Sequence, residues 1–413
     1  MRRQKTKPSH HGRRDFIKKM VVGAISIFTP LPKSFLREQK EIHRLRKGEM
    51  YYRRLGRTEL YISEISLGGS PLPDQSLLVQ IIERGVNYID TSCAYGNGNG
   101  ERQIGRLFKE IGRDKVYVGT KFKLDGKNWS EESIIKSVNG SLSRLQTDCV
   151  DVLLIHGAEL EQLTDERVLG AFEKLKAQGK YRFKGLSCHS DHNRIVRKAV
   201  ECGHYDMLML GYNVFDIQRT EKKIKAYDDY LGENGISRLL ELAASKDVGI
   251  IAMKTLKVGG RRQNLEKYRT GTTSICQAML KWVLENKNVT SAATEILNYQ
   301  QMEEDLGVVG MTLSQEERMN LYCFVKENSK DYCHMCELCQ RNCPSGIKTT
   351  AILRCLAYRE SYGKKNLARR LYSSLEPEQR ASSCKDCGEC ERACLYEVNI
   401  RKRIKEAHRI LFS

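Results

Sequence analysis

The chain has 413 residues, a length that predicts at least two domains. Its formal net charge of +19 is unevenly distributed: residues 1–54 hold 16 basic against 4 acidic side chains, residues 330–413 hold 17 against 10, and the remainder is balanced. Because nucleic-acid binding needs a basic face on a folded domain, the balanced central region excludes nucleic acid as the expected partner. We interpret the basic tail as a solubilising surface, with a docking surface for an acidic partner as the alternative.

Residues 1–50 are predicted to be a targeting signal and a linker. Arg13 and Arg14 precede Phe16 and Lys18, and an apolar run follows at 20–31. This pattern resembles a twin-arginine export signal, and the run is shorter than the ~20 residues that a membrane-spanning helix needs. We therefore expect a periplasmic protein that touches a membrane only if the signal stays uncleaved. The alternatives are a basic N-terminal arm and a cytoplasmic protein that starts at Met50.

Apolar, β-branched runs alternate with amphipathic runs through the middle of the chain. The predicted strands are 62–68, 87–91, 116–121, 150–156, 183–187, 207–213, 249–254 and 290–294. The predicted helices are 74–84, 101–111, 130–145, 165–178, 190–201, 234–246, 273–285 and 299–308. Eight strand–helix units between residues 51 and 327 indicate the α/β class and a (β/α)8 TIM barrel. An open doubly wound sheet is the alternative, but its usual glycine motif is missing at residues 68–71.

Four polar residues fall at or just after the ends of successive predicted strands. Asp90 ends the second strand and Tyr95 lies on the following loop, while Lys121 ends the third strand and His156 ends the fourth. Because the carboxyl ends of barrel strands meet at the face that carries active sites, we expect these side chains to share one cup. Each residue alone has an ordinary structural explanation, so the prediction depends on all four occurring together.

These four side-chain types suit proton transfer to a carbonyl oxygen. A phenol, with a pKa near 10, keeps its proton at neutral pH and can donate it to a developing alkoxide. We expect the Lys121 ammonium to lower the pKa of Tyr95, and Asp90 to hold Lys121 in place. A neutral His156 would donate a hydrogen bond to the substrate oxygen.

Residues 51–309 resemble the aldo-keto reductases. The likeness is carried by the segments 52–60 (YRRLGRTEL), 65–69 (ISLGG) and 85–91 (GVNYIDT), and by the four polar residues, which match the family's Asp/Tyr/Lys/His tetrad. The resemblance implies a barrel that reduces aldehydes and ketones, or oxidises alcohols. It also implies a nicotinamide cofactor, usually NADPH, extended across the barrel mouth.

The family's cofactor positions are matched less closely. The resemblance assigns four residues to the cofactor: Ser187, Tyr212, Lys254 and Glu304. Cys188 stands where the family usually has Asn, and acidic side chains at 303–305 would repel a 2′-phosphate. We therefore expect NADH, or a tightly held nucleotide, in preference to NADPH. The segment Gly259–Arg262 is either a pyrophosphate site or a solvated basic loop.

Eight of the 15 cysteines form two runs near the C-terminus with the spacing C-x2-C-x2-C-x3-C. This spacing resembles that of bacterial ferredoxins, in which the fourth cysteine of each run ligates the other cluster, and a zinc site has no use for it. We predict two [4Fe–4S] clusters in a mainly helical, ferredoxin-type domain at 328–413. One cluster takes Cys333, Cys336, Cys339 and Cys394, and the other takes Cys343, Cys384, Cys387 and Cys390.

Two functional hypotheses follow. The first is an exported iron–sulfur aldo-keto reductase that acts on a small carbonyl or alcohol, with sugar derivatives as candidates. Its electrons would pass between the nicotinamide and the clusters, and on to a redox partner protein. The second is an electron-transfer protein whose barrel has lost nucleotide binding.

Overall fold

The computed structural model describes residues 44–124, 129–217, 236–256 and 265–412. All of them belong to one compact unit, residues 43–413. Among these described residues, no helix is both long and apolar enough to cross a membrane. Residues 1–43 of the predicted leader and the predicted pyrophosphate segment 259–262 lie outside the described residues.

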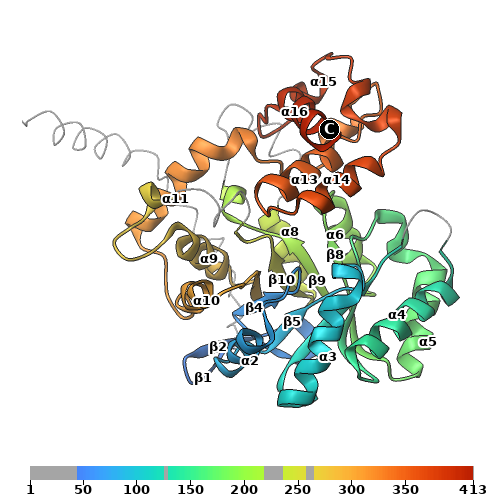
Figure 1. Cartoon of the computed structure of the whole chain (residues 1–413), viewed down its shortest axis with the longest axis vertical. Coiled ribbons are helices and arrows are strands. Elements are labelled where there is room, and N and C mark those ends of the chain that lie inside the picture. Colours follow the sequence, from blue (N-terminus) through green and yellow to red (C-terminus); the bar gives the residue numbers. More distant parts are fainter. Residues whose placement is uncertain (1–43, 125–128, 218–235, 257–264, 413) are drawn as a thin grey trace, which may run out of the picture. The chain divides into compact units, whose positions relative to one another are not determined.

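Parallel strands close into a barrel, as the alternating sequence pattern predicts (Figure 1). Each strand pairs with the next one along the chain, and the last pairs with the first. The barrel strands are β4 (Ile65–Gly68), β5 (Tyr88–Asp90), β6 (Tyr117–Phe122), β7 (Val150–Ile155), β8 (Tyr181–Cys188), β9 (Met207–Gly211), β10 (Gly249–Met253) and β11 (Ser291–Thr294). The predicted α/β (β/α)8 barrel is confirmed.

The chain that enters the barrel closes its N-terminal end. A small antiparallel sheet precedes the barrel and consists of β1 (Arg44–Lys47), β2 (Met50–Arg54) and β3 (Tyr61–Ser63). Leu55 and Leu60, between β2 and β3, pack with the strand residues Val152 and Ile251 in one buried cluster. The amide of Arg57 donates to the carbonyl of Asp247, just before β10 begins. This arrangement leaves the opposite, C-terminal end of the barrel for chemistry.

The predicted strand 62–68 is divided in two at Glu64. Glu64 is almost fully buried, and its carboxylate accepts a hydrogen bond of 2.8 Å from Nε of Arg53. The remaining N–H groups of Arg53 donate to the carbonyl oxygens of Leu284 and Val289. A buried ion pair whose donors are all satisfied can fix a bend there, between the antiparallel sheet and the barrel. The apolar pattern alone did not reveal this break.

The barrel helices follow the predicted ranges closely. They are α2 (Gln75–Glu83), α3 (Asn99–Ile111), α4 (Glu131–Leu145), α5 (Glu166–Ala177), α6 (His192–Glu201), α8 (Ile236–Ser245), α9 (Ile275–Glu285) and α10 (Tyr299–Leu306). Ser130 and Ser274 start α4 and α9 by accepting the backbone N–H groups of Ser133 and Gln277 in capping boxes. The apolar faces of the helices and the outward-facing strand residues share one large core.

The remaining chain is helical and has a core of its own. Its helices are α11 (Gln315–Asn328), α12 (Leu338–Arg341), α13 (Thr349–Glu360), α14 (Lys365–Ser373), α15 (Glu389–Arg392) and α16 (Ile400–Phe412). Of these, α11 packs against α9. Helices α13 and α14 are separated by a turn in which Gly363 has a left-handed φ of 61°.

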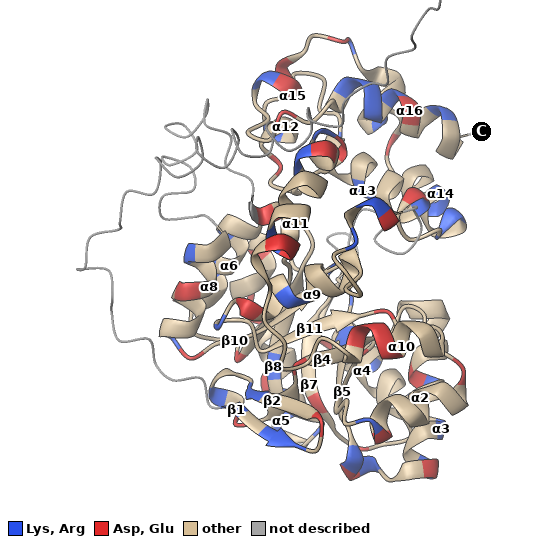
Figure 2. Ribbon diagram, turned by 90° about the vertical axis from the view of Figure 1, so that its left-hand side faces the viewer, with Lys and Arg blue, Asp and Glu red and all other residues tan. Residues whose placement is uncertain are grey.

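The two cysteine runs fold into the same local structure. Helices α12 and α15 lie side by side and start 51 residues apart, and so do α13 and α16 (Figure 2). The same offset relates the left-handed residues Met335 and Asp386, two positions after the first cysteine of each run. The tail is therefore an internal repeat, in which each cysteine loop is followed by a long helix.

Candidate active site

The structure brings the predicted tetrad together at the C-terminal end of the barrel. Asp90 is the last residue of β5, Lys121 lies near the end of β6, and His156 directly follows β7. Tyr95 begins a short 3-10 turn after β5, where Gly96 and Asn97 adopt left-handed conformations that bend the loop back over the strand ends. Three neighbouring parallel strands therefore present these groups at one edge.

Lys121 connects the acid and the phenol. Its ammonium donates to Oδ2 of Asp90 at 2.5 Å, to the carbonyl of Thr91 at 2.8 Å and to the hydroxyl of Tyr95 at 3.5 Å. Lys121 is 1% exposed and Asp90 is 4% exposed. Burial lowers the pKa of Lys121 and raises that of Asp90, while each charge opposes the shift of the other. The ammonium is thus held in one position beneath the phenol.

His156 faces the phenol from the other side. Its ring meets that of Tyr95 edge to face, with 5.5 Å between the centroids and an interplanar angle of 89°. Nδ1 of His156 lies 3.0 Å from the hydroxyl of Ser92. Burial, followed by nearby cationic side chains, lowers the pKa of His156 to about 3. The imidazole is therefore neutral at ordinary pH, as the sequence analysis expects of a hydrogen-bond donor.

The structure reverses the expected direction of the Tyr95 pKa shift. The sequence analysis predicts that Lys121 lowers this pKa. Instead, burial and then the negative charge of Asp90 raise the pKa of Tyr95 well above 10. Desolvation of the phenolate outweighs the ammonium, whose charge is largely balanced by Asp90 at 2.5 Å. The phenol of Tyr95 consequently keeps its proton at neutral pH.

Two of the predicted cofactor residues lie at the barrel mouth. Ser187 is fully buried near the end of β8, and its hydroxyl accepts from the amide of Gly157 at 2.8 Å and donates to Ile155 O at 3.3 Å. Lys254 follows β10 with a left-handed φ of 58°, and its charge lowers the pKa of His156. Ser187 therefore already has partners for its hydroxyl, whereas Lys254 contributes positive charge to the mouth.

The other two predicted cofactor residues have different surroundings. Tyr212 is 4% exposed and packs on Trp282 of α9, while its hydroxyl accepts from Nδ2 of Asn286 at 3.0 Å. Glu304, in α10, accepts a hydrogen bond of 2.5 Å from Ser274, the N-cap of α9. The Tyr212 ring thus lies between the barrel and its helices. The carboxylate of Glu304 lies at the start of α9.

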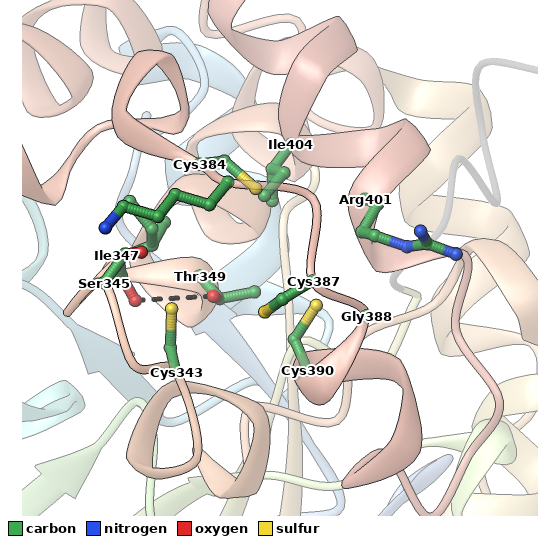
Figure 3. Close-up of a pocket in the computed structure, with 11 residues that line it drawn as sticks. Cys343, Ser345, Ile347, Thr349, Cys384, Cys387, Gly388, Cys390, Arg401 and Ile404 are labelled. Carbon is green, nitrogen blue, oxygen red and sulfur yellow. Dashed lines mark hydrogen bonds between the residues drawn. The ribbon is translucent and has the colours of Figure 1, made fainter.

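One predicted cysteine quartet lines a pocket in the tail (Figure 3). The four cysteines that line it are Cys343, Cys384, Cys387 and Cys390. Three belong to the second run, and Cys343 comes from the first. Burial, together with the charges of Glu391, Cys384 and Cys343, raises the pKa of Cys390 to about 11. The structure therefore brings together the crossed quartet that the spacing predicts.

The other predicted quartet also gathers in the tail. Burial raises the pKa of Cys336 to about 12, and the charges of Cys333 and Cys394 add to the effect. Burial, and then the charges of Cys333, Cys336 and Cys394, raise the pKa of Cys339. Cys394 thus lies with the first three cysteines of the other run. Among the described residues, no three Cys, His, Asp or Glu side chains converge tightly enough to bind a single metal ion.

The loops that carry these cysteines fit an iron–sulfur cluster. The amides of Met335 and Asp386 donate to the sulfur atoms of Cys333 and Cys384, each at 3.4 Å. The left-handed backbone at Met335 and Asp386 turns these amides toward the thiols. Four-thiolate sets supported by backbone N–H groups are the ligands that [4Fe–4S] clusters use.

Three side chains around the tetrad were not predicted from the sequence. His189 follows β8, and its ring centroid lies 5.5 Å from that of His156. Arg354 and Tyr358, in α13, lie near enough to shift the pKa values of His156 and Tyr95 respectively. His189 comes directly after the predicted strand 183–187 and Cys188, the last residue there that was compared with the family. The helix residues had no signal, because proximity between positions about 200 to 260 residues apart is invisible in a local pattern.

Comparisons with known proteins agree with this geometry. The aldo/keto reductase family model matches residues 73–273. L-galactose dehydrogenase from Arabidopsis thaliana is 27% identical over 296 residues, which cover 62% of this chain and 87% of the plant protein. The NADH-specific methylglyoxal reductase of Escherichia coli is 25% identical over 312 residues, which cover 63% and 94%. The holo form of aldo-keto reductase AKR11C1 from Bacillus halodurans shares the fold, with 22% identity and a TM-score of 0.52 over 66% of this chain and 95% of that one. Residues 73–273 thus match the aldo/keto reductase family, and the chain is an aldo-keto reductase-type oxidoreductase.

Proposed function

We propose that this protein interconverts a small carbonyl compound and its alcohol, with Tyr95 as the acid and base. The observation that carries the proposal is the buried ammonium of Lys121, which contacts both Asp90 at 2.5 Å and the Tyr95 hydroxyl at 3.5 Å. A phenol in that position, opposite a neutral imidazole, has the geometry needed to protonate a carbonyl oxygen.

The residues divide the work of reduction between them. His156 donates a hydrogen bond to the carbonyl oxygen and makes the carbonyl carbon more electrophilic. The O–H bond of Tyr95 breaks as its proton passes to the same oxygen, and Lys121 stabilises the phenolate that remains. Asp90 keeps Lys121 in place throughout. The reverse sequence describes alcohol oxidation.

We propose that a nicotinamide nucleotide binds at the barrel mouth, where it would supply or accept the hydride. Lys254 would contribute positive charge to this site, whereas the buried Ser187 would have to exchange its present hydrogen-bond partners to hold the nucleotide. The carboxylate of Glu304, which lies in α10 and is bound by Ser274 at the start of α9, would repel a 2′-phosphate. We therefore propose NADH as the preferred nucleotide, and the NADH-specific relative from Escherichia coli supports this choice.

The tail is proposed to hold two [4Fe–4S] clusters, which would carry single electrons to and from a redox partner protein. The support is the crossed arrangement of thiols around the pocket at Cys343, Cys384, Cys387 and Cys390. The 51-residue repeat of α12–α13 in α15–α16 supplies a matching site for the other quartet. Because these sites need a reducing cytoplasm for assembly, the twin-arginine pattern at 13–18 suits export of the folded protein to the periplasm.

Sugar derivatives are the proposed substrates, supported by the similarity to L-galactose dehydrogenase. The competing proposal is an electron-transfer protein whose barrel no longer binds nucleotide. One observation favours it: Lys364 of the tail donates to the carbonyl of Ser70 and lies 3.5 Å from Glu295, after β4 and β11. This contact lies on the side of the mouth along which a nucleotide would extend.

Anaerobic purification of the full chain separates the two proposals. Iron and sulfide analysis and electron paramagnetic resonance report the clusters, and mass analysis of the released small molecules reports any bound nucleotide. NADH should bind in a calorimetric titration and should be oxidised when aldoses or ketoses are added. Intact clusters without nucleotide binding or carbonyl reduction would overturn the enzymatic proposal in favour of electron transfer alone.

A further inference from the structure

The tail touches the barrel at loops on two sides of the mouth. On one side Lys364 meets Ser70 and Glu295, after β4 and β11. On the other side the amide of Asp191, after β8, donates to the carbonyl of Met335 at 2.8 Å. The hydroxyl of Tyr332 accepts from Asn213, after β9, at 2.9 Å. Because α13 lies between these anchors in the chain, it is held over the C-terminal ends of the strands.

Two side chains of α13 lie near the tetrad. Arg354 and Tyr358 are four residues apart and so share one helix face. The proximity of Tyr358 to Tyr95, and of Arg354 to His156 and His189, is reflected in the pKa values of those three groups. Figures 1 and 2 both place α13 on the side of the barrel at which the site lies. The active site is thus built from both parts of the chain.

The side chains whose charges act on His156 are all positively charged. The charges that lower the pKa of His156 belong to Lys121, Lys123, Lys254 and Arg354. Lys121 is balanced by Asp90, and the nearby carboxylate of Asp191 is engaged by Arg341 at 3.2 Å. Arg354 is partly buried and forms no ion pair with any residue of the described ranges. A guanidinium in this situation is a ready partner for a carboxylate or phosphate.

We propose that Arg354 is a substrate-binding residue, and that the substrate carries a carboxylate or phosphate in addition to its carbonyl group. The proposal rests on the proposed carbonyl chemistry of Tyr95 and His156, and it narrows the substrate class. With the carbonyl oxygen between Tyr95 and His156, the anionic group points up toward α13 and pairs with Arg354. Binding of such a substrate also ties the tail to the barrel at the reacting centre.

The test compares matched charged and neutral probes on the full, cluster-containing protein, with NADH as reductant. The carboxylate pair is 4-carboxybenzaldehyde and its methyl ester, and the phosphate pair is glyceraldehyde 3-phosphate and glyceraldehyde. In at least one pair the anion should have the higher kcat/KM, by roughly 10- to 100-fold. The Arg354→Gln variant should lose this preference through KM, whereas Arg354→Lys should keep part of it.

Arg359→Gln is the matched control, because Arg359 lies on the same helix and is not among the charges that act on His156. It should keep the preference for the anion, and the KM for NADH should be unchanged in all variants. Equal kcat/KM for both members of each pair in the unmodified protein would overturn the proposal. So would an Arg354→Gln variant that loses activity equally toward charged and neutral probes.

A binding measurement distinguishes failure of the Arg354 proposal from failure of the proposed carbonyl chemistry. If no carbonyl probe is reduced, the proposed function fails, and binding of the alcohol 4-(hydroxymethyl)benzoate is then measured by calorimetry. Binding that disappears in Arg354→Gln would still support an anion site at Arg354. Binding that is unaffected by the substitution, or absent from the unmodified protein, would contradict it.

Discussion

The ammonium of Lys121 lies 2.5 Å from the carboxylate of Asp90, and both side chains are almost completely removed from solvent. The two residues come from neighbouring strands, β5 and β6, and the pair lies directly below the phenol of Tyr95. A buried ion pair of this kind contributes little net stability, because desolvation offsets the attraction. The position of this ion pair is better explained by the proton transfer proposed for Tyr95.

Removing the ammonium should therefore damage both activity and stability. In Lys121→Met, Asp90 is left as a buried charge without its partner, and unfolding should become easier by about 3–5 kcal/mol. Carbonyl reduction should fall at least about 100-fold. The control is Lys115→Met, at an exposed lysine before β6. The double variant Asp90→Asn, Lys121→Met should recover part of the urea midpoint but no activity; recovery of turnover would contradict the role of Lys121.

The pH dependence of reduction follows from two pKa shifts. His156 has a pKa of about 3, so the imidazole is almost entirely neutral from about pH 5 upward. The pKa of Tyr95 is raised well above 10, so the phenol keeps its proton through the neutral range. We expect kcat/KM for reduction to be flat between about pH 5 and about pH 9 and to fall at higher pH. A decrease of tenfold or more with a midpoint near the ordinary pKa of histidine would show that His156 is exposed to protonation.

Paired cysteine substitutions test the crossed ligand sets. Cys343→Ser combined with Cys384→Ser removes two ligands of one predicted cluster, so about four of about eight iron atoms should remain. Cys333→Ser combined with Cys343→Ser removes one ligand from each cluster, and both should be lost or impaired. Cys323→Ser, at an exposed cysteine outside both runs, is the control. If each run instead formed its own cluster, the two double variants would exchange their results.

The acidic surroundings of α9 predict a preference for NADH. Ser274 donates to the carboxylate of Glu304 at 2.5 Å, which places negative charge at the N-terminus of α9, a position that would otherwise favour phosphate. NADH should bind at least about tenfold more tightly than NADPH in a calorimetric titration. Glu304→Gln should narrow this difference, while Glu316→Gln, at an exposed position on α11, should not. Tighter binding of NADPH by the unmodified protein would refute the assignment.

The barrel and the neighbourhood of the tetrad were predictable because their signals are local. Alternating strand and helix patterns define a parallel barrel, and such a barrel brings strand ends together whatever the loop lengths. Asp90, Lys121 and His156 could thus be placed side by side without coordinates. The two cysteine runs are equally explicit, since ligand spacing is written directly in the sequence.

Other features depend on contacts that no local pattern contains. The direction of the Tyr95 pKa shift required knowledge of how deeply the phenol is buried. Tyr212 satisfies the aromatic pattern of a cofactor residue, yet its partner is Trp282 in a later helix. Arg354 belongs to another part of the chain altogether. In each case the property of the residue depends on desolvation or on a long-range contact, and both arise only after folding.

The most direct test of the account is carbonyl reduction by Tyr95→Phe, compared with Tyr322→Phe at an exposed position on α11. Both variants are purified anaerobically, and circular dichroism and iron content establish that fold and clusters are retained. We predict that Tyr95→Phe lowers kcat by about 10²- to 10⁴-fold with little change in NADH affinity, and that Tyr322→Phe behaves like the unmodified protein. A Tyr95→Phe enzyme that retains turnover within a few-fold of the unmodified protein would contradict the assignment of the phenol as proton donor.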